Sequence, residues 1–185
     1  MQTKTRSTLL AAAVVLLVTL SGCATLGIAN PFSDAKDDYD DARSAWNNGN
    51  HAEALYELSS GINQDPKHYP SIKFLVKNYE TGMTEIESRL EELAAREQTV
   101  ASTLEEVEIY RNLYYFVSNM DEGADPRVLA FRKDQIEIPL TDYSEQLADA
   151  RTRGFGLAMT KGQQLLEFGE YQEAYDTFHD AVYAF

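Results

Sequence analysis

The chain has 185 residues, with 16 Lys and Arg against 30 Asp and Glu and a formal net charge of −14. Such an acidic chain is a poor candidate for binding nucleic acid or an anionic membrane surface, because clustered basic side chains hold phosphate groups. The single Cys excludes a disulfide framework and a thiolate zinc site, since each needs several thiols. Hydrophobic residues make up 44% of the chain, which is typical of one folded domain.

The first residues have the pattern of an export signal. Lys4 and Arg6 precede an almost wholly apolar run over residues 9–20. A helix that spans a bilayer needs about 20 apolar residues, so this run is too short to serve as a stable anchor. We therefore expect residues 1–22 to be a removable signal peptide.

A short motif closes this segment, Leu20-Ser21-Gly22-Cys23. It resembles the lipobox of bacterial lipoproteins, which implies cleavage before Cys23 and lipidation of its sulfur. Several acyl chains, palmitate among them, tether a domain stably where one chain does not. In a Gram-negative host, Ala24 in place of Asp further implies the outer membrane, facing the periplasm. An ordinary secretory signal with a chance Cys is the alternative.

Cleavage would leave 14 basic and 30 acidic residues, a net charge of −16. We expect contact with the membrane through the lipid anchor only. Residues 23–32 carry the lipidated Cys and a linker with Gly, Asn and Pro, and residues 33–185 are predicted to form one all-α domain.

An αα-hairpin opens this domain. Ser33 is the expected N-cap of a helix that reaches about Asn48, and its acidic run, residues 37–41, is expected to be a solvated face. Gly49 ends this helix, and a second one runs from Asn50 to about residue 65.

Long helices are predicted in the middle of the domain. Apolar residues recur at alternating steps of four and three from Ile72 to Leu93 and from Val100 to Tyr114, which favours helices packed along their whole length. We favour two antiparallel helices, with Ser102-x-x-Glu105 as a possible restart. One continuous helix through residue 97 is the alternative.

A second helical pair is predicted at the end of the chain. One helix runs from residue 141 or 142 to about residue 168, and Gly169 breaks it. The residues expected on one face of the next helix are Tyr171, Ala174, Phe178, Ala181 and Phe185.

The two hairpins share a pattern, written Gly49-x-His51-x-Glu53-Ala54-x-x-x-Leu58 and Gly169-x-Tyr171-x-Glu173-Ala174-x-x-x-Phe178. Both resemble the second half of a tetratricopeptide repeat, in which small residues let paired helices approach closely. The resemblance implies a helical-hairpin, tetratricopeptide-like bundle with long central helices. Generic αα-hairpins are the alternative, because the two units are not a whole number of repeats apart.

Catalytic and metal-binding motifs are absent from the sequence. The three His residues, His51, His68 and His179, lie in different segments, and no nucleophile elbow, P-loop, dinucleotide fingerprint or H-E-x-x-H motif occurs. We expect no enzyme, no metal and no cofactor.

The tetratricopeptide resemblance implies a partner-binding stripe on the first helix, formed by Lys36, Tyr39, Arg43, Trp46 and Asn47. Tyr, Trp and Arg are the residues that anchor protein interfaces. Trp46 fits the hydrophobic core equally well.

These observations together predict a lipid-anchored envelope lipoprotein that binds another envelope protein or peptide as a scaffold or assembly factor. A small-ligand-binding accessory subunit of an envelope transporter is the alternative, because the aromatic residues between Tyr110 and Phe116 suit a cavity lining. A structural spacer is a third interpretation.

Overall fold

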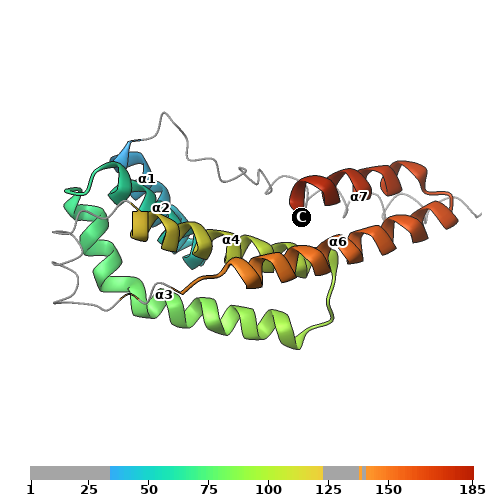
Figure 1. Cartoon of the computed structure of the whole chain (residues 1–185), viewed down its shortest axis with the longest axis horizontal. Helices are drawn as coiled ribbons and strands as arrows, with labels where there is room; N and C mark the ends of the chain where they lie inside the picture. The colour runs from blue at the N-terminus through green and yellow to red at the C-terminus, as the bar shows by residue number, and fades with distance from the viewer. Residues whose placement is uncertain (1–33, 123–137, 139–140) are drawn as a thin grey trace, which may run out of the picture. The chain divides into compact units, whose positions relative to one another are not determined.

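The computed structural model describes residues 34–122, 138 and 141–185. These residues form six α-helices and no strand, so the predicted all-α class is confirmed (Figure 1). The helices are α1 (Ala35–Asn47), α2 (His51–Gln64), α3 (Tyr69–Ala95), α4 (Val100–Glu122), α6 (Ser144–Glu167) and α7 (Tyr171–Ala184). They belong to one compact unit, residues 32–185; residues 1–22, which are expected to form a signal peptide, and Cys23 lie outside the described residues.

Helix α1 begins one residue later than expected. Asp34, not Ser33, is the residue before its first turn, and its carboxylate accepts hydrogen bonds from the backbone N–H groups of Lys36 at 2.9 Å and Asp37 at 3.0 Å. An N-cap of this kind satisfies amides that have no partner inside the helix. Gly49, with φ of 81°, then turns the chain into α2.

The main hydrophobic core lies among α1, α2, α3 and α4. Helix α2 supplies its most buried side chains, and it packs against α1, α3 and α4. The largest fully buried aliphatic residues of α2 and α3 are Leu55, Leu58, Ile62 and Leu75. The apolar residues Ala54, Leu55, Leu58 and Ile62 recur at helical spacing along α2, and all four are buried.

The two long helices are separate, and they do not pack along their whole length. Helices α3 and α4 contact each other less than each contacts α2, which takes up much of the interface that the heptad pattern predicted between them. Tyr79 of α3 stacks on Phe116 of α4 with ring centroids 6.0 Å apart. Tyr114, expected in the buried seam, is 38% exposed.

The restart of the chain at α4 uses Thr99 and not Ser102. The Thr99 hydroxyl accepts a hydrogen bond from the Ser102 backbone N–H at 3.1 Å, and the Ser102 hydroxyl accepts one from the Thr99 N–H at 2.8 Å. This reciprocal pair is a capping box with Ser in the position usually held by Glu.

One acidic residue of α1 is not solvated. Asp38 is 3% exposed, and its carboxylate accepts a hydrogen bond from the Gln64 side chain at 2.7 Å. The side chain packs close to Gly61, where a Cβ would lie 3.2 Å from that of Asp38. The expectation of a fully solvated acidic face was therefore wrong at this position, because α2 covers it.

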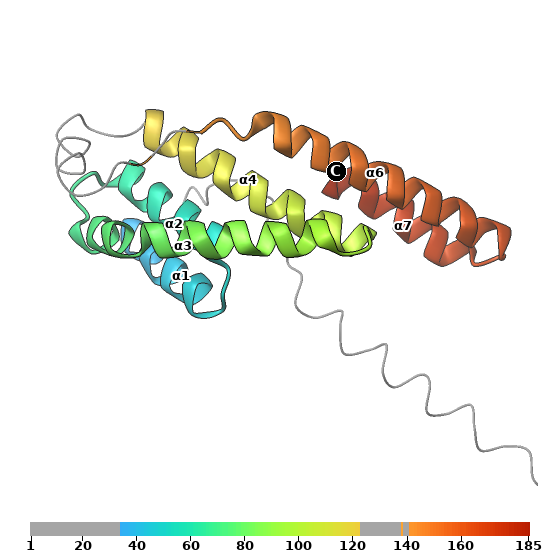
Figure 2. The same ribbon diagram turned by 90° about the horizontal axis from the view of Figure 1, so that it is seen from below.

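Helices α6 and α7 form the second hairpin, and they run antiparallel side by side (Figure 2). Gly169 has φ of 82°, close to that of Gly49, and the same pattern of backbone hydrogen bonds closes both turns. The buried residues of α6 are mostly small: Leu147, Ala150, Gly154, Ala158 and Gly162. Small residues allow a close helix approach, and the Phe178 ring packs directly over Gly162.

Candidate partner-binding surfaces

The five residues of the stripe predicted on α1 differ in their exposure. Lys36, Arg43 and Asn47 are exposed, and the Lys36 ammonium pairs with Asp40 at 2.9 Å. Tyr39 and Trp46 are only half-buried, but their rings pack against neighbouring side chains of the same chain. The five residues are near one another on α1; the Arg43 guanidinium lies over the Tyr39 ring, 5.8 Å from its centroid, and Lys36 and Asn47 are exposed.

Phe74 of α3 occupies the space next to both aromatic rings. Its centroid lies 6.1 Å from that of Tyr39 and 5.6 Å from that of Trp46, each in an edge-to-face arrangement. Trp46 also lies over Gly82, where a Cβ would come 3.0 Å from the indole. The aromatic part of the predicted stripe therefore holds α1 against α3.

A second surface carries most of the exposed apolar side chains. Nine large hydrophobic residues are exposed in the described part of the chain, and seven of them belong to the α6–α7 hairpin. These seven are Phe155, Leu166, Phe168, Tyr171, Tyr175, Val182 and Tyr183. Exposed apolar side chains that gather on one part of a fold are candidates for an interaction site, whereas single exposed ones are ordinary.

Helix α7 presents four of these residues on one side, which we call the aromatic stripe: Tyr171, Tyr175, Val182 and Tyr183. Their spacing places them within roughly 120° of the helix circumference. His179 lies between two of the rings, 6.0 Å from Tyr175 and 4.8 Å from Tyr183 by ring centroids. Tyr171 was expected on one face with Ala174 and Phe178, but it is 71% exposed whereas Ala174 is buried.

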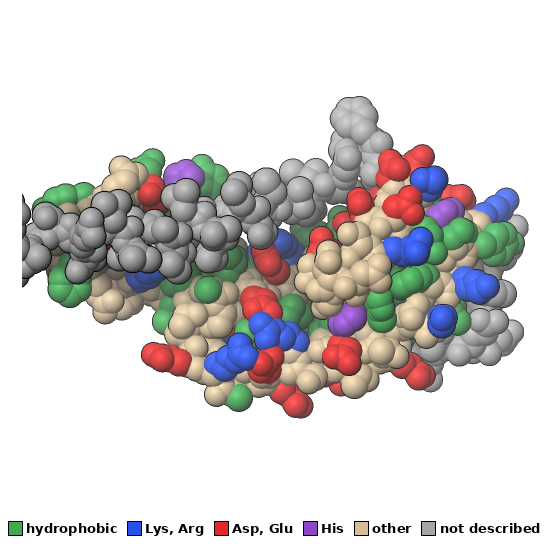
Figure 3. Space-filling model, turned by 180° about the vertical axis from the view of Figure 1, so that it is seen from behind, with side chains coloured by type: hydrophobic (Ala, Val, Ile, Leu, Met, Phe, Trp, Pro, Cys, Tyr) green, Lys and Arg blue, Asp and Glu red, His purple; other side chains and the backbone are tan. Residues whose placement is uncertain are grey.

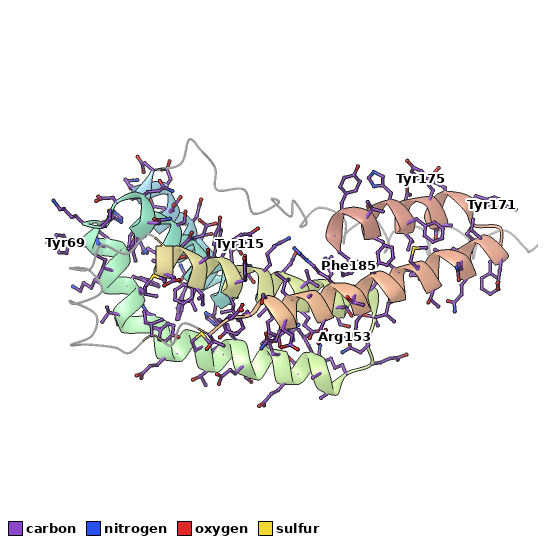
Figure 4. All side chains as sticks on the ribbon, viewed as in Figure 1. Tyr69, Tyr115, Arg153, Tyr171, Tyr175 and Phe185 are labelled. Atoms are coloured by element: carbon purple, nitrogen blue, oxygen red, sulfur yellow. The ribbon has the colours of Figure 1, made fainter. Side chains whose placement is uncertain are left out.

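The other side of α7 faces α6. Ala174 and Ala181 are buried there, and Phe185 packs against Gly154 and the small cluster of Val107, Leu147 and Ala150. Figure 4 shows Tyr171 near the turn and Phe185 at the opposite end of α7. The packing of α7 on α6 thus directs the aromatic stripe away from the hairpin interface.

Three carboxylates line the edge of the aromatic stripe. Glu173, Asp176 and Asp180, which we call the acidic ridge, are exposed and follow one another at steps of three and four. This spacing places them in roughly the next 60° of the helix. No Lys or Arg occurs from Gly162 to the end of α7. Elsewhere acidic and basic side chains are close together, as over α3 (Figure 3).

An ion pair between Arg153 and Glu106 joins α6 to α4. Arg153 donates a hydrogen bond to the Glu106 carboxylate at 2.6 Å, and its place on α6 is labelled in Figure 4. This ion pair and the apolar cluster of Val107 with Leu147 hold the start of α6 on α4. The acidic ridge lies on the other helix of the hairpin, and in the described part of the chain no Lys or Arg pairs with it; the Asp180 carboxylate lies 3.5 Å from Nδ1 of His179.

A polar pocket of about 420 Å³ lies between the start of α2 and the middle of α3 and α4. Four carboxylates are part of its lining: Glu53, Glu85, Glu105 and Glu108. Arg89 also lines it and neutralises Glu105 through a two-point ion pair, with Nη2 to Oε2 at 2.8 Å.

The aromatic residues of α4 do not line this pocket. Tyr110 packs on Tyr143, Tyr115 on Tyr56, and Phe116 is 1% exposed. The ligand-carrier interpretation depended on these rings forming a cavity wall. In the described residues they contribute to packing between helices instead.

Several carboxylates come together beside α2. Burial raises the pKa of Glu57 to about 7, and the nearby carboxylates of Asp38, Asp41 and Glu53 add to the increase. Burial likewise raises the pKa of Glu108. These groups make the surface next to α1 and α2 sensitive to pH.

The described residues contain no group of three or more His, Cys, Asp or Glu side chains that could hold a metal ion. His68 lies next to the first turn of α3, with its Nδ1 2.8 Å from the Ser71 hydroxyl oxygen. His51 packs on Trp46 at 4.5 Å. None of the described helices is long and apolar enough to cross a membrane.

Comparison of this chain with protein-family models, with curated proteins and with solved structures finds no match in any of the three. The residues of the aromatic stripe were not recognised from the sequence as a surface. The usable signal is the combination of Tyr at helical spacing with a stretch free of Lys and Arg from residue 162 onward.

Proposed function

We propose that this chain is an envelope lipoprotein, anchored through Cys23, whose helical domain binds another protein as a scaffold or assembly factor. The observation that carries the binding function is the concentration of exposed apolar side chains on the α6–α7 hairpin. Tyr side chains supply large contact areas with little loss of conformational entropy, and they are enriched at interfaces.

The shape of the hairpin also supports this function. Small residues at the α6–α7 interface allow the two helices to pack closely, so α6 holds the exposed side of α7 in a fixed position. The resemblance to tetratricopeptide repeats agrees with a role in protein binding, and it stays part of the proposal. The exposed residues Lys36, Arg43 and Asn47 of α1 are the second candidate surface.

Co-purification after crosslinking in the native envelope tests the proposal. The wild-type protein is compared with Tyr171→Ser/Tyr175→Ser/Tyr183→Ser and with Lys36→Ser/Arg43→Ser/Asn47→Ser, each checked for folding by circular dichroism. We expect one envelope protein to be captured by the wild type and lost from the first variant. Equal capture by all three proteins, or capture by none, would reject binding through these surfaces.

The lipid anchor has a separate test. Cys23→Ser should move the protein from the membrane fraction to the soluble fraction without changing its circular dichroism spectrum, because the described helices have no span of their own. A Cys23→Ser variant that stays in the membrane fraction would contradict lipidation.

A further inference from the structure

We infer that the aromatic stripe of α7 docks a basic, amphipathic segment of another protein, one that carries Lys or Arg beside apolar side chains. The inference rests on the proposed protein-binding function and specifies the chemistry of the partner.

The exposed rings account for the apolar part of this partner. Tyr171, Tyr175 and Tyr183 are 71%, 62% and 66% exposed, and Val182 between them is 69% exposed. Helix α7 packs mainly on α6, so none of the described helices covers this side. An amphipathic helix with apolar residues at steps of three and four presents a matching face.

The charges account for the basic part. Glu173, Asp176 and Asp180 lie next to the rings, with His179 3.5 Å from Asp180, and the last Lys or Arg of the sequence is Lys161 of α6. A Lys or Arg of a partner can make two favourable interactions here, because it pairs with the carboxylates and its cation is attracted to the face of a Tyr ring. Both interactions select against an acidic partner.

The same charges disfavour a second copy of the chain and an anionic lipid surface. Two α7 helices that met through their aromatic stripes would bring two acidic ridges together, and like charges across an interface are costly. Anionic head groups would meet the same repulsion. A partner protein with a basic segment is the occupant that satisfies both the rings and the carboxylates.

Binding of model peptides tests the inference with the full mature chain. The probes are a fluorescein-labelled amphipathic helix built of Leu and Lys, and its counterpart in which Glu replaces Lys. We expect fluorescence anisotropy to show binding of the Leu/Lys peptide at least about tenfold tighter than the Leu/Glu peptide. Higher ionic strength should weaken this binding, because the charges at the surface are screened.

Reversing the charge of the acidic ridge distinguishes binding at this site from non-specific binding of a basic peptide to an acidic protein. Glu173→Lys/Asp176→Lys/Asp180→Lys should exchange the preference, so that the Leu/Glu peptide binds more tightly than the Leu/Lys peptide. The matched control Glu80→Lys/Glu87→Lys/Glu91→Lys changes the net charge equally on exposed positions of α3 and should keep the original preference. An unchanged preference in the α7 variant, or an exchange in both variants, would overturn the inference.

Two other outcomes would also overturn it. Concentration-dependent dimerisation that disappears in Tyr171→Ser/Tyr175→Ser/Tyr183→Ser would assign the aromatic stripe to a second copy of the chain. If that variant binds the Leu/Lys peptide as tightly as the wild-type protein does, the peptide binds at a site other than the aromatic stripe. If native crosslinking captures a partner while the peptide preference fails, only the chemistry of the partner is wrong; if it captures none, the proposed function itself fails.

Discussion

The orientation of the aromatic stripe depends on the packing of Phe178 against Gly162, and the Gly162→Ala substitution tests this contact. A Cβ at this position would lie 2.6 Å from Cζ and 2.8 Å from Cδ1 of the Phe178 ring, closer than carbon atoms approach one another. The ring must therefore move outward or the helices must separate. Either movement loses packing between α6 and α7.

Gly156→Ala is the matched control on the same helix. No atom lies within 4 Å of a Cβ built at Gly156. Both substitutions gain about 0.5–1 kcal/mol from helix propensity, and overpacking at Gly162 costs about 1–3 kcal/mol. The free energy of unfolding of the Gly162→Ala variant should thus be about 1–3 kcal/mol lower than that of the Gly156→Ala variant.

Urea unfolding followed by circular dichroism measures both free energies. Combining Gly162→Ala with Phe178→Leu should recover part of the loss, because the smaller side chain leaves room for the new methyl group. If Gly162→Ala is as stable as Gly156→Ala, Phe178 does not pack over Gly162, and the described orientation of α7 is wrong.

Three further predictions concern the rest of the domain. Leu58→Ala removes a fully buried side chain from the main core and should lower the free energy of unfolding by about 2–5 kcal/mol in urea; a loss below about 1 kcal/mol would contradict this core. Thr99→Ala removes the N-cap of α4 and should lower the free energy of unfolding by about 1 kcal/mol. An unchanged free energy of unfolding would refute the role of Thr99 as the cap. Because the folded-state pKa of Glu57 is raised to about 7, the stability due to its neutral form is complete below about pH 4.5 and is lost as the pH rises through about 7. Thermal melts should therefore show Glu57→Gln more stable than wild type near about pH 8, by about 1 kcal/mol after solvent screening, and nearly equal to it near about pH 5. A stability difference between the two proteins that does not change with pH would refute this prediction.

The local patterns of the sequence predicted most of the helices. Helix starts and ends follow from residues a few positions away, so Gly49 and Gly169 mark their turns correctly, and the spacing of Ala54, Leu55 and Leu58 predicts a face that is buried. These features depend on propensity and periodicity, which act within one or two helical turns.

Tertiary packing accounts for what the sequence did not predict. The partner of Asp38 is Gln64, which lies 26 residues away, so its burial has no local signal. The insertion of α2 between α3 and α4 likewise cannot be read from a heptad pattern, because the pattern defines an apolar face without naming its neighbour. Tyr171 follows the helical spacing of Ala174 and still lies on the exposed side, since only the position of α6 decides which side is covered.

The proposed function requires the aromatic stripe of α7 to contact a partner protein in the cell envelope. Site-specific photocrosslinking in living cells tests it most directly, with a photoreactive amino acid at Tyr175 and, as the control, at exposed Glu80 of α3. We expect an adduct with one envelope protein from position 175 and none from position 80, lost when Glu173→Lys/Asp176→Lys/Asp180→Lys is introduced. No adduct at position 175, or the same adduct from both positions, would contradict the claim.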